Sequence, residues 1–291
     1  MASQCIGLIG IGLLGRALAE RWLAAGDEVV GFDRDPAALP AFSALGGRSA
    51  DGVREVAEST RRIVLCLPDH AVVRSVVSEM GDTLAAGHVL IDVTTGDSDT
   101  AVALERDLQP RGITYLEATV SGSSDHVRQR DALVMTGGDA DACAACGDVF
   151  APFARSVLHA GRVGSAAKLK LATNLVLGLN RAALAEGLAF ARAIGLDPPI
   201  ALQALREGLA YSRIMDSKGP KLLAEDFTPQ ARLAQHLKDV RLMLDAAGKA
   251  GLSLPLSETH RRLLDAAVSA GWGELDNCAI YRLYTAEDGG P

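Results

Sequence analysis

The chain has 291 residues, of which 48% are hydrophobic and 22% are charged. A chain of this length and composition can bury a large core, and its length predicts two domains. Its net charge of −7 comes from 36 acidic and 29 basic residues spread along the sequence without a basic block, which argues against nucleic acids and anionic membranes as partners.

The first predicted elements are a strand, a glycine-rich turn, a helix and a second strand. Cys5 to Ile9 is a short apolar run, as expected of a buried parallel strand. The turn, Gly10-Ile11-Gly12-Leu13-Leu14-Gly15, leads into a helical segment from Arg16 to Ala25, and Glu28 to Phe32 has the pattern of the second strand. A GxGxxG sequence between a strand and a helix predicts a dinucleotide-binding turn.

The glycines of this turn have separate roles. Gly10 permits the tight turn, Gly12 lets the backbone approach a pyrophosphate, and Gly15 lets the helix pack close to the strand. Asp33, at the end of the second strand, is expected to accept hydrogen bonds from the adenosine ribose and to repel the 2′-phosphate of NADP. The guanidinium of Arg34 could pair with that phosphate. NAD is therefore favoured, and NADP stays open.

Strands and helices alternate up to about residue 160. Strands are predicted at 61–67, 88–93, 113–118 and 132–136, with an edge strand at 156–159, and helices at 36–45, 71–79 and 142–150. This alternation implies a doubly wound α/β domain, a parallel sheet with right-handed crossovers. The glycine turn, Leu67-Pro68, Thr95 and Ser121 fall at the ends of strands, where an open α/β sheet binds ligands.

From about Gly164 the strand signals vanish. The pattern of residues from Ser165 to Ile194 predicts one long helix, and more helices are expected at 199–208, 229–250 and 255–270. We therefore expect a dinucleotide-binding domain over residues 1–163 and an all-helical substrate and dimerisation domain over residues 164–291. Surplus apolar surface on the helices over 169–194 and 255–270 predicts a homo-oligomer, a dimer or a tetramer. The end of the chain, Ala286 to Pro291, is expected to fray.

The cysteines and the apolar runs indicate the compartment. The five cysteines are scattered, which suits reduced thiols. Cys143 and Cys146 form a CxxC pair without a second ligand pair nearby, so we expect two small apolar residues rather than a metal or redox site. No apolar run approaches the roughly 20 residues that span a bilayer, and no basic and apolar leader precedes the first strand. We expect a cytoplasmic protein that contains no metal.

Three further sites could carry chemistry. On the long helix, Lys170 and Asn174 are four residues apart and share a face, whereas Lys168 lies about 200° away from Lys170 around the axis. Lys170 heads a mostly apolar stripe, although a surface lysine that snorkels would fit the same pattern. The stretch from Glu117 to Ser124 offers N–H groups and hydroxyls to an anion, or is an ordinary polar loop. Lys238-Asp239 is a charge pair on a later helix, which is often merely solvated.

In their order and spacing, these motifs resemble those of the β-hydroxyacid dehydrogenase family, which includes 3-hydroxyisobutyrate dehydrogenase, tartronate semialdehyde reductase and the glyoxylate and succinic semialdehyde reductases. The family's cofactor fingerprint matches Gly10 to Gly15, and its DAPVSGG substrate motif matches Glu117 to Ser123. Its GxxxxxKxxxN catalytic motif matches Gly164 to Asn174, and its KDL cofactor motif matches Lys238 to Val240.

The resemblance implies a role for each matching residue. Lys170 is similar to the family's catalytic lysine and Asn174 to its orienting partner. Substrate binding would use Ser121, Gly122, Ser123 and Asp239, and cofactor binding would use Gly10, Ile11, Gly12, Leu13, Leu14, Gly15, Asp33, Arg34, Leu67, Pro68, Thr95 and Lys238. The C-terminal half would have a 6-phosphogluconate dehydrogenase-like fold. The implied activity is an NAD(P)-dependent oxidoreductase of CH–OH groups that interconverts a small β-hydroxyacid and its semialdehyde, with the lysine as general acid and base.

The chain also departs from the family pattern. Glu117 and Thr119 replace Asp and Pro in the substrate motif, and Ser123 replaces Gly. Arg128 and Arg130 follow this motif and could bind a second anionic group. Two other functions stay open. One is an imine reductase-like NADPH enzyme, although those usually carry Asp or Tyr in place of the lysine, and the other is a dinucleotide-sensing module without catalysis.

Overall fold

The computed structural model describes residues 4–285, so the end expected to fray, 286–291, lies outside the described residues. The chain divides into two compact units, residues 1–170 and residues 171–291. The domain roles expected for residues 1–163 and 164–291 stay predictions. No helix in the described part of the chain is long and apolar enough to cross a membrane.

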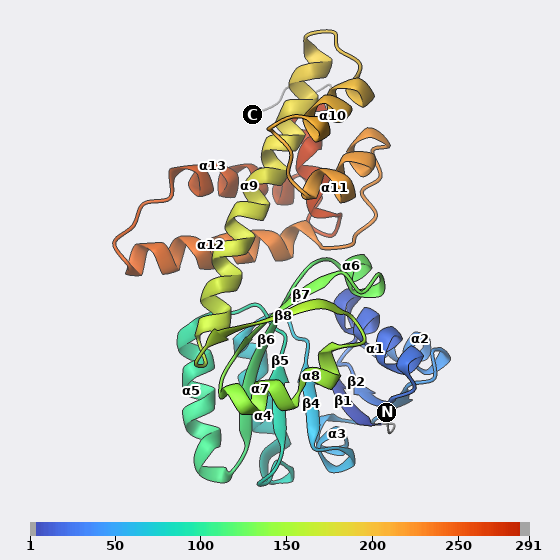
Figure 1. Cartoon of the computed structure of the whole chain (residues 1–291), viewed down its shortest axis with the longest axis vertical. Coiled ribbons are helices and arrows are strands. Elements are labelled where there is room, and N and C mark those ends of the chain that lie inside the picture. The colour runs from blue at the N-terminus through green and yellow to red at the C-terminus, as the bar shows by residue number, and fades with distance from the viewer. Residues whose placement is uncertain (1–3, 286–291) are drawn as a thin grey trace. The chain divides into compact units, whose positions relative to one another are not determined.

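The first unit is built on a single sheet. Among the described residues its strands are β1 (Cys5–Ile9), β2 (Glu28–Phe32), β3 (Arg48–Ser49), β4 (Arg62–Leu65), β5 (Val89–Asp92), β6 (Thr114–Ser121), β7 (Ala132–Gly137) and β8 (Ala154–Gly161). Their order is β3-β2-β1-β4-β5-β6-β7-β8, and β1 to β6 are all parallel (Figure 1). This arrangement confirms the predicted doubly wound, mainly parallel dinucleotide-binding fold.

One part of the sheet is not parallel. Within a sheet predicted to be mainly parallel, β7 runs antiparallel to β6. The connection between Ser121 and Ala132 holds only the short helix α6 (Ser124–Arg128). A parallel crossover needs a dozen or more residues, so the chain reverses instead. The helix predicted over 142–150 is likewise two shorter helices, α7 (Ala140–Ala145) and α8 (Gly147–Phe150).

Helices cover both faces of this sheet. Residues of α1 (Leu13–Ala25), α2 (Leu39–Ala44), α7 and α8 pack into one core, and residues of α3 (Val53–Ser59), α4 (His70–Met80) and α5 (Ser98–Leu108) pack into the other. Along β1, Ile6 and Leu8 enter the first core and Ile9 enters the second. Because successive side chains of a strand point to opposite faces, a strand buried on both sides is an unbroken apolar run in the sequence.

The second unit is helical in its described part. The long helix α9 (Ser165–Ala193) starts in the first unit and continues into the second, followed by α10 (Pro198–Glu207), α11 (Ile214–Leu223), α12 (Leu233–Lys249), α13 (Pro255–Ser269) and α14 (Arg282–Thr285). A short 3-10 helix lies at Asn277–Tyr281 in this unit, and three others lie in the first unit, at Pro36–Ala38, Gly81–Thr83 and Gln109–Arg111. Leucines of α9, α10, α12 and α13 share one apolar core in this unit. The predicted all-helical second half is confirmed.

Candidate active site

The glycine turn after β1 is tight and leaves open space beside Gly12. Gly10 has φ +97°, and a Cβ there would lie 2.1 Å from the carbonyl oxygen of Cys66. A Cβ on Gly15 would lie 2.0 Å from the carbonyl oxygen of Gly10, whereas a Cβ on Gly12 would meet no atom within 4 Å. The fold itself therefore needs Gly10 and Gly15, and Gly12 borders open space.

The same turn leaves the start of α1 suited to an anion. Gly12 is the N-cap of α1, no side chain caps it, and the first turn contains no acidic residue. Backbone N–H groups at a helix N-terminus bind phosphate groups. Leu13 and Leu14 open this helix, and Leu14 packs against the adjacent core. These residues fit a dinucleotide.

Asp33 ties the end of β2 to the glycine turn. Its Oδ2 accepts a hydrogen bond of 2.6 Å from the N–H of Ile11, and its Oδ1 accepts one of 2.9 Å from the N–H of Asp35. Each carboxylate oxygen has a second lone pair, which remains available to a ribose hydroxyl. Arg34 follows directly and is exposed. The structure thus places Asp33 beside the glycine turn, with Arg34 as the next residue of the chain.

The ends of β1, β4 and β5 lie side by side. The N–H of Cys66 donates to the carbonyl of Ile9 at 2.8 Å, and the N–H of Leu67 donates to Oγ1 of Thr94 at 3.2 Å. Pro68 and Thr95 follow at these two ends, Pro68 exposed and Thr95 half-buried. These predicted cofactor residues of the first unit therefore come together at the carboxyl-terminal ends of the central strands.

The predicted substrate loop continues from β6. Gly122 is exposed and has φ +147°. Ser123 is the N-cap of α6, where its hydroxyl lies 2.8 Å from Nδ1 of His126 and its N–H donates to the same nitrogen at 3.3 Å. The sequence did not indicate His126. In this chain the serine that replaces the family's glycine also shapes the loop.

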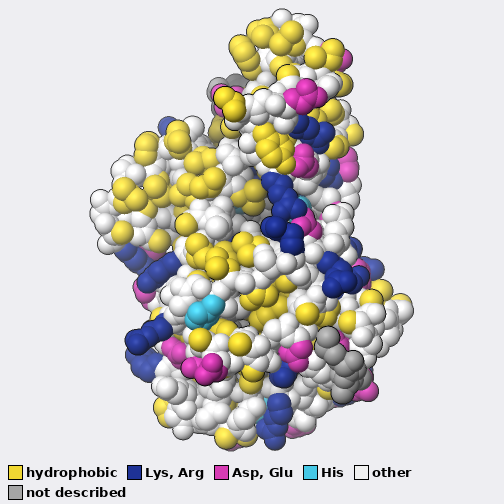
Figure 2. Space-filling model, viewed as in Figure 1, with side chains coloured by type: hydrophobic (Ala, Val, Ile, Leu, Met, Phe, Trp, Pro, Cys, Tyr) yellow, Lys and Arg dark blue, Asp and Glu magenta, His cyan; other side chains and the backbone are white. Residues whose placement is uncertain are grey.

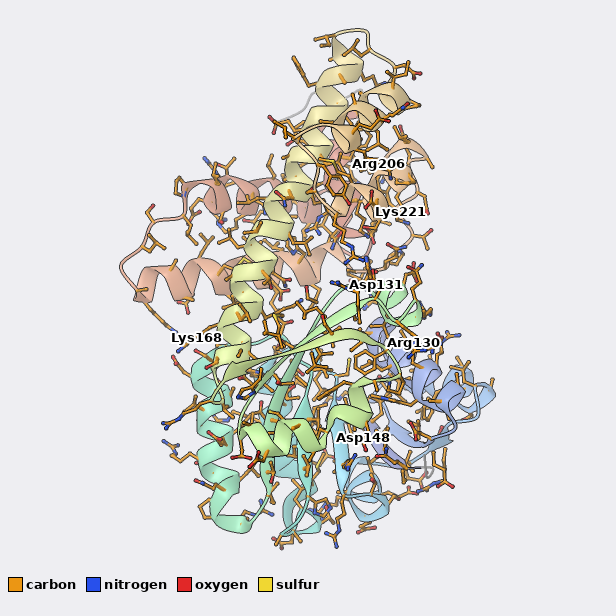
Figure 3. The ribbon with its side chains drawn as sticks, in the orientation of Figure 1. Arg130, Asp131, Asp148, Lys168, Arg206 and Lys221 are labelled. Atoms are coloured by element: carbon orange, nitrogen blue, oxygen red, sulfur yellow. The ribbon has the colours of Figure 1, made fainter. Side chains whose placement is uncertain are left out.

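Lys170 lies against this loop. Its buried Nζ donates a hydrogen bond of 2.7 Å to the carbonyl oxygen of Val120, the residue before Ser121. Lys168, labelled in Figure 3 near the start of α9, is exposed instead. The first unit therefore brings the predicted catalytic lysine next to the predicted substrate loop.

Glu117 has a structural role that the sequence analysis did not recognise. Its buried carboxylate accepts hydrogen bonds from the backbone N–H groups of Gly164 at 2.7 Å, Ala166 at 3.2 Å and Ala167 at 3.1 Å. Burial raises the pKa of Glu117, and the three N–H groups oppose that rise. The only signal in the sequence was an acidic residue inside an otherwise apolar strand.

A second buried carboxylate lies on the neighbouring strand. Asp92 pairs with Glu117 in the sheet register. Its Oδ1 accepts from the N–H of Thr94 at 2.8 Å and its Oδ2 accepts from the hydroxyl of Tyr115 at 2.6 Å. Nε2 of His70 lies 3.5 Å from the same Oδ2. This network, also missed from the sequence, supports the loop that carries Thr94 and Thr95.

The remaining predicted residues lie in the helical unit. Nδ2 of Asn174 donates to Oδ2 of Asp239 at 3.1 Å, and Nζ of Lys238 lies 3.2 Å from Oδ1 of Asp239. Asp239 therefore joins the predicted orienting amide to the predicted late cofactor contact. Across residues 4–285, no group of three or more His, Cys, Asp or Glu side chains could hold a metal ion.

Arg128 does not match the suggestion that it binds a second anionic group. Its Nε lies 2.6 Å from Oε2 of Glu20 and its Nη1 lies 3.0 Å from Oδ1 of Asp125. Two carboxylates already balance this guanidinium, which lowers its value as an anion site. Arg130 is exposed, with φ +59°.

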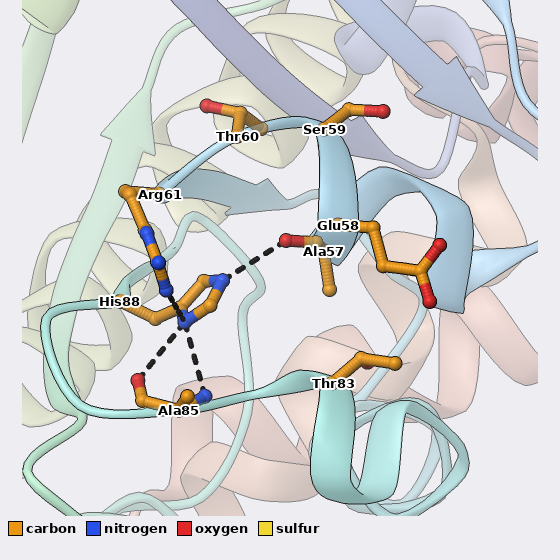
Figure 4. A pocket seen from close by; sticks show the side chains of 8 residues that line it. All are labelled: Ala57, Glu58, Ser59, Thr60, Arg61, Thr83, Ala85 and His88. Carbon is orange, nitrogen blue, oxygen red and sulfur yellow. Dashed lines mark hydrogen bonds between the residues drawn. The ribbon is translucent and has the colours of Figure 1, made fainter.

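A cavity of about 340 Å³ lies at the opposite end of the strands, where β4 and β5 begin (Figure 4). The imidazole of His88 is fixed in its wall, with Nε2 2.9 Å from the carbonyl oxygen of Ala57 and Nδ1 3.1 Å from the N–H of Ala85. Ligands of open α/β sheets bind at the carboxyl ends of the strands. This cavity is therefore separate from the candidate active site.

Comparison with known proteins identifies the family. The NAD-binding domain of 6-phosphogluconate dehydrogenase matches residues 5–161, and the domain described as NAD-binding of NADP-dependent 3-hydroxyisobutyrate dehydrogenase matches residues 164–284. The 2-hydroxy-3-oxopropionate reductase of Escherichia coli (strain K12) is 30% identical over 278 residues, which cover 94% of this chain and 95% of that protein. The chain belongs to the β-hydroxyacid dehydrogenase family. It is an oxidoreductase whose cofactor is a nicotinamide dinucleotide.

Solved structures agree with this assignment. The 3-hydroxyisobutyrate dehydrogenase of Salmonella typhimurium superposes with a TM-score of 0.88 at 25% identity, covering 97% of this chain and 100% of that one. An imine reductase from Pseudomonas sp. superposes with a TM-score of 0.68 at 22% identity, covering 97% of this chain and 99% of that one. The second likeness shows the fold alone.

Proposed function

We propose that the protein interconverts a small β-hydroxyacid and its semialdehyde, with Lys170 as the general acid and base. The observation that carries this proposal is the buried ammonium of Lys170, 2.7 Å from the carbonyl of Val120 and beside Ser121. A lysine buried beside a loop of hydroxyls and N–H groups can reach the oxygen of a substrate whose carboxylate that loop holds.

Each group of residues has its own role in the proposed reaction. The turn from Gly10 to Gly15 would hold a nicotinamide dinucleotide, which would supply or accept the hydride when bound. Ser121, Gly122 and Ser123 hold the substrate's carboxylate and so fix which carbon is presented. Nζ of Lys170 gives a proton to the carbonyl oxygen during reduction and takes one from the hydroxyl during oxidation. Asn174, one helical turn farther along α9 and bonded to Asp239, orients the substrate.

The test compares two neighbouring lysines. Lys170→Ala should lower kcat by about 10²–10⁴, the usual contribution of general acid–base catalysis, with little change in cofactor affinity. Lys168→Ala is the matched control and should leave kcat nearly unchanged, since Lys168 is exposed. Both variants would be assayed with 3-hydroxyacids and semialdehydes and with both cofactors. An active Lys170→Ala variant would refute the assignment.

Two other functions can be separated by the same assays. Imine reduction requires turnover of cyclic imines, and a sensing module without catalysis requires that no hydroxyacid or semialdehyde is turned over. The basic side chain of Lys170 and its place beside the substrate loop favour the hydroxyacid reaction over both. Turnover of imines alone would favour the first alternative.

We propose NAD as the preferred cofactor, because the carboxylate of Asp33 stands at the end of β2 beside the glycine turn. Asp33→Ala should weaken NAD more than NADP, since it removes both a ribose acceptor and the repulsion of a 2′-phosphate. Gly12→Ala is a second probe. Its Cβ meets no atom, so the melting temperature should hold while the affinity for both dinucleotides falls. Equal losses of NAD and NADP in Asp33→Ala would place the ribose elsewhere.

We also propose that the helical unit forms a homo-oligomer, most simply a dimer. Figure 2 shows apolar side chains gathered where α9 ends and α10 begins, and Phe190, Ile194, Leu196 and Ile200 are exposed there. Such a patch favours burial against another surface. Phe190→Glu should shift sedimentation toward the monomer, and a stable monomer of the unaltered chain at micromolar concentration would rule the dimer out. A cytoplasmic location stays a prediction.

A further inference from the structure

Strand β6 holds the start of α9 at two points. The carboxylate of Glu117 accepts hydrogen bonds from the N–H groups of Gly164, Ala166 and Ala167. Three residues farther along the strand, the carbonyl of Val120 accepts a hydrogen bond from Nζ of Lys170, which itself lies three residues beyond Ala167. Strand and helix are thus fixed in one register by a pair of contacts, both within the first unit.

We propose that Glu117 is a positioning residue for Lys170: its carboxylate anchors the first turn of α9 and thereby sets where the lysine ammonium lies relative to Ser121 and Ser123. This inference rests on the proposed function of Lys170. Glu117 itself touches neither substrate nor cofactor in this scheme.

The site is shaped for a carboxylate. Gly137 lies opposite Glu117 in the register of β6 and β7, and a Cβ there would lie 2.4 Å from Oε2 of Glu117. A carboxylate accepts hydrogen bonds at both oxygens, whereas an amide of the same size would turn an NH₂ group toward an N–H donor. A negative charge also stabilises the positive end of a helix. Replacement of Glu117 by an amide should therefore loosen the first turn of α9.

The effect on Lys170 is mechanical rather than directly electrostatic. A strand rises about 3.3 Å per residue, so the positions of Glu117 and Val120 on β6 are about 10 Å apart. At that separation, charges interact weakly compared with a hydrogen bond of 2.7 Å, which is the distance from Nζ of Lys170 to its carbonyl acceptor. A displacement of about 1 Å at a reacting group can lower a rate by about 10²-fold.

The experiment compares two conservative substitutions of Glu117. Glu117→Gln should lower kcat by about 10- to 100-fold with an unchanged cofactor dissociation constant, and Glu117→Asp, which keeps the charge, should restore kcat to within about threefold of the unaltered enzyme. Asp139→Asn is the matched control. It makes the same carboxylate-to-amide change at the N-cap of α7, where Asp139 accepts from the N–H of Ala142 at 2.9 Å, and it should leave kcat unchanged.

A double-mutant cycle separates positioning from general loss of structure. If Glu117 acts through Lys170, Glu117→Gln should not lower kcat further once Lys170→Ala is present. An equal drop in both backgrounds would overturn the inference, and so would full activity of Glu117→Gln. Full activity of Lys170→Ala would instead overturn the proposed function. Should Glu117→Gln fail to fold, Gly137→Ala replaces it in the double-mutant cycle with Lys170→Ala, because its added Cβ would displace the same carboxylate.

Discussion

The buried carboxylates of the first unit and the buried guanidinium of Arg181 in the helical unit are stabilised in different ways. In the first unit, three backbone N–H groups hold Glu117, and the N–H of Thr94 and the hydroxyl of Tyr115 hold Asp92. In the helical unit, Arg181 is 2% exposed, and its Nε and Nη2 have no hydrogen-bond acceptor among the described residues. Burial lowers the pKa of Arg181 to about 10, partly opposed by the charge of Asp276. Fixed donors therefore stabilise the carboxylates of the first unit, whereas Nε and Nη2 of Arg181 have only the charge of nearby groups such as Asp276.

Two histidines accompany Arg181. The rings of His236 and His260 lie 5.2 Å apart. They fit there because α9 carries Gly178, where a Cβ would lie 2.7 Å from Nε2 of His236 and 3.0 Å from Cε1 of His260. Burial, and after it the charge of Arg181, lowers the pKa of His260 to about 4. Hydrogen-bonded buried carboxylates thus support the candidate site, whereas the burial of Arg181 and His260 in the helical unit carries a cost, which for His260 depends on pH.

The largest expected effect comes from breaking the network of the first unit. Asp92→Ala would leave the hydroxyl of Tyr115 and the N–H of Thr94 buried without their acceptor. Each such group costs about 1–3 kcal/mol, so we expect a loss of about 3–5 kcal/mol in the free energy of unfolding. Urea unfolding followed by tryptophan fluorescence, to which Trp22 of the same unit contributes, measures it. Asp92→Asn, which keeps one carbonyl acceptor, is the control and should lose less. A loss below about 1 kcal/mol would contradict this account.

The second effect depends on pH and belongs to the helical unit. Well above pH 6.5, His260 is neutral in both the folded and the unfolded chain, so it does not make the free energy of unfolding depend on pH. Between pH 6.5 and about 4, the unfolded chain takes up a proton that the folded chain does not, so stability falls as the pH falls. At about 1.4 kcal/mol for each pH unit, His260 accounts for about 3 kcal/mol over this window. Urea unfolding at pH 7.5 and at pH 4.5 should show a smaller difference for His260→Gln than for the unaltered chain, and identical differences would refute the shift.

Much of the fold was predictable because local patterns specify it. The glycine turn with its flanking strands follows from GxGxxG and two apolar runs, and α9 ends at Ala193, one residue before the predicted end. Helix α5, one of those that the sequence did not predict, has a weaker pattern. Its buried face consists of Ala101, Leu104 and Leu108 within a polar segment, and such spacing does not form an apolar run.

The contacts of the candidate site were less predictable, because they join distant parts of the chain. The bonds from Gly164, Ala166 and Ala167 to Glu117 span 47, 49 and 50 residues, and the bond from Tyr115 to Asp92 spans 23. Sequence spacing cannot indicate which backbone N–H group meets a given carboxylate. The motifs predict which residues face the ligands, and the tertiary structure identifies the groups that hold those residues in place.

The smallest expected effect concerns Arg181 itself. Because its Nε and Nη2 have no acceptor among the described residues, replacing the guanidinium by an apolar side chain of similar length removes a desolvation cost and few hydrogen bonds. The nearby carboxylates keep partners, since Asp276 lies 2.8 Å from Nζ of Lys218 and Asp239 accepts from Asn174. Arg181→Met should therefore change the free energy of unfolding at pH 7.5 by no more than about 1 kcal/mol, and NMR titration should show a higher pKa for His260. Arg181→Ala tests volume instead of charge and should cost about 2–4 kcal/mol, because it leaves a cavity among α9, α12 and α13. If Arg181→Met were as costly as Arg181→Ala, the guanidinium would be part of a stabilising ion network, and the contrast between Arg181 and the carboxylates of the first unit would fail.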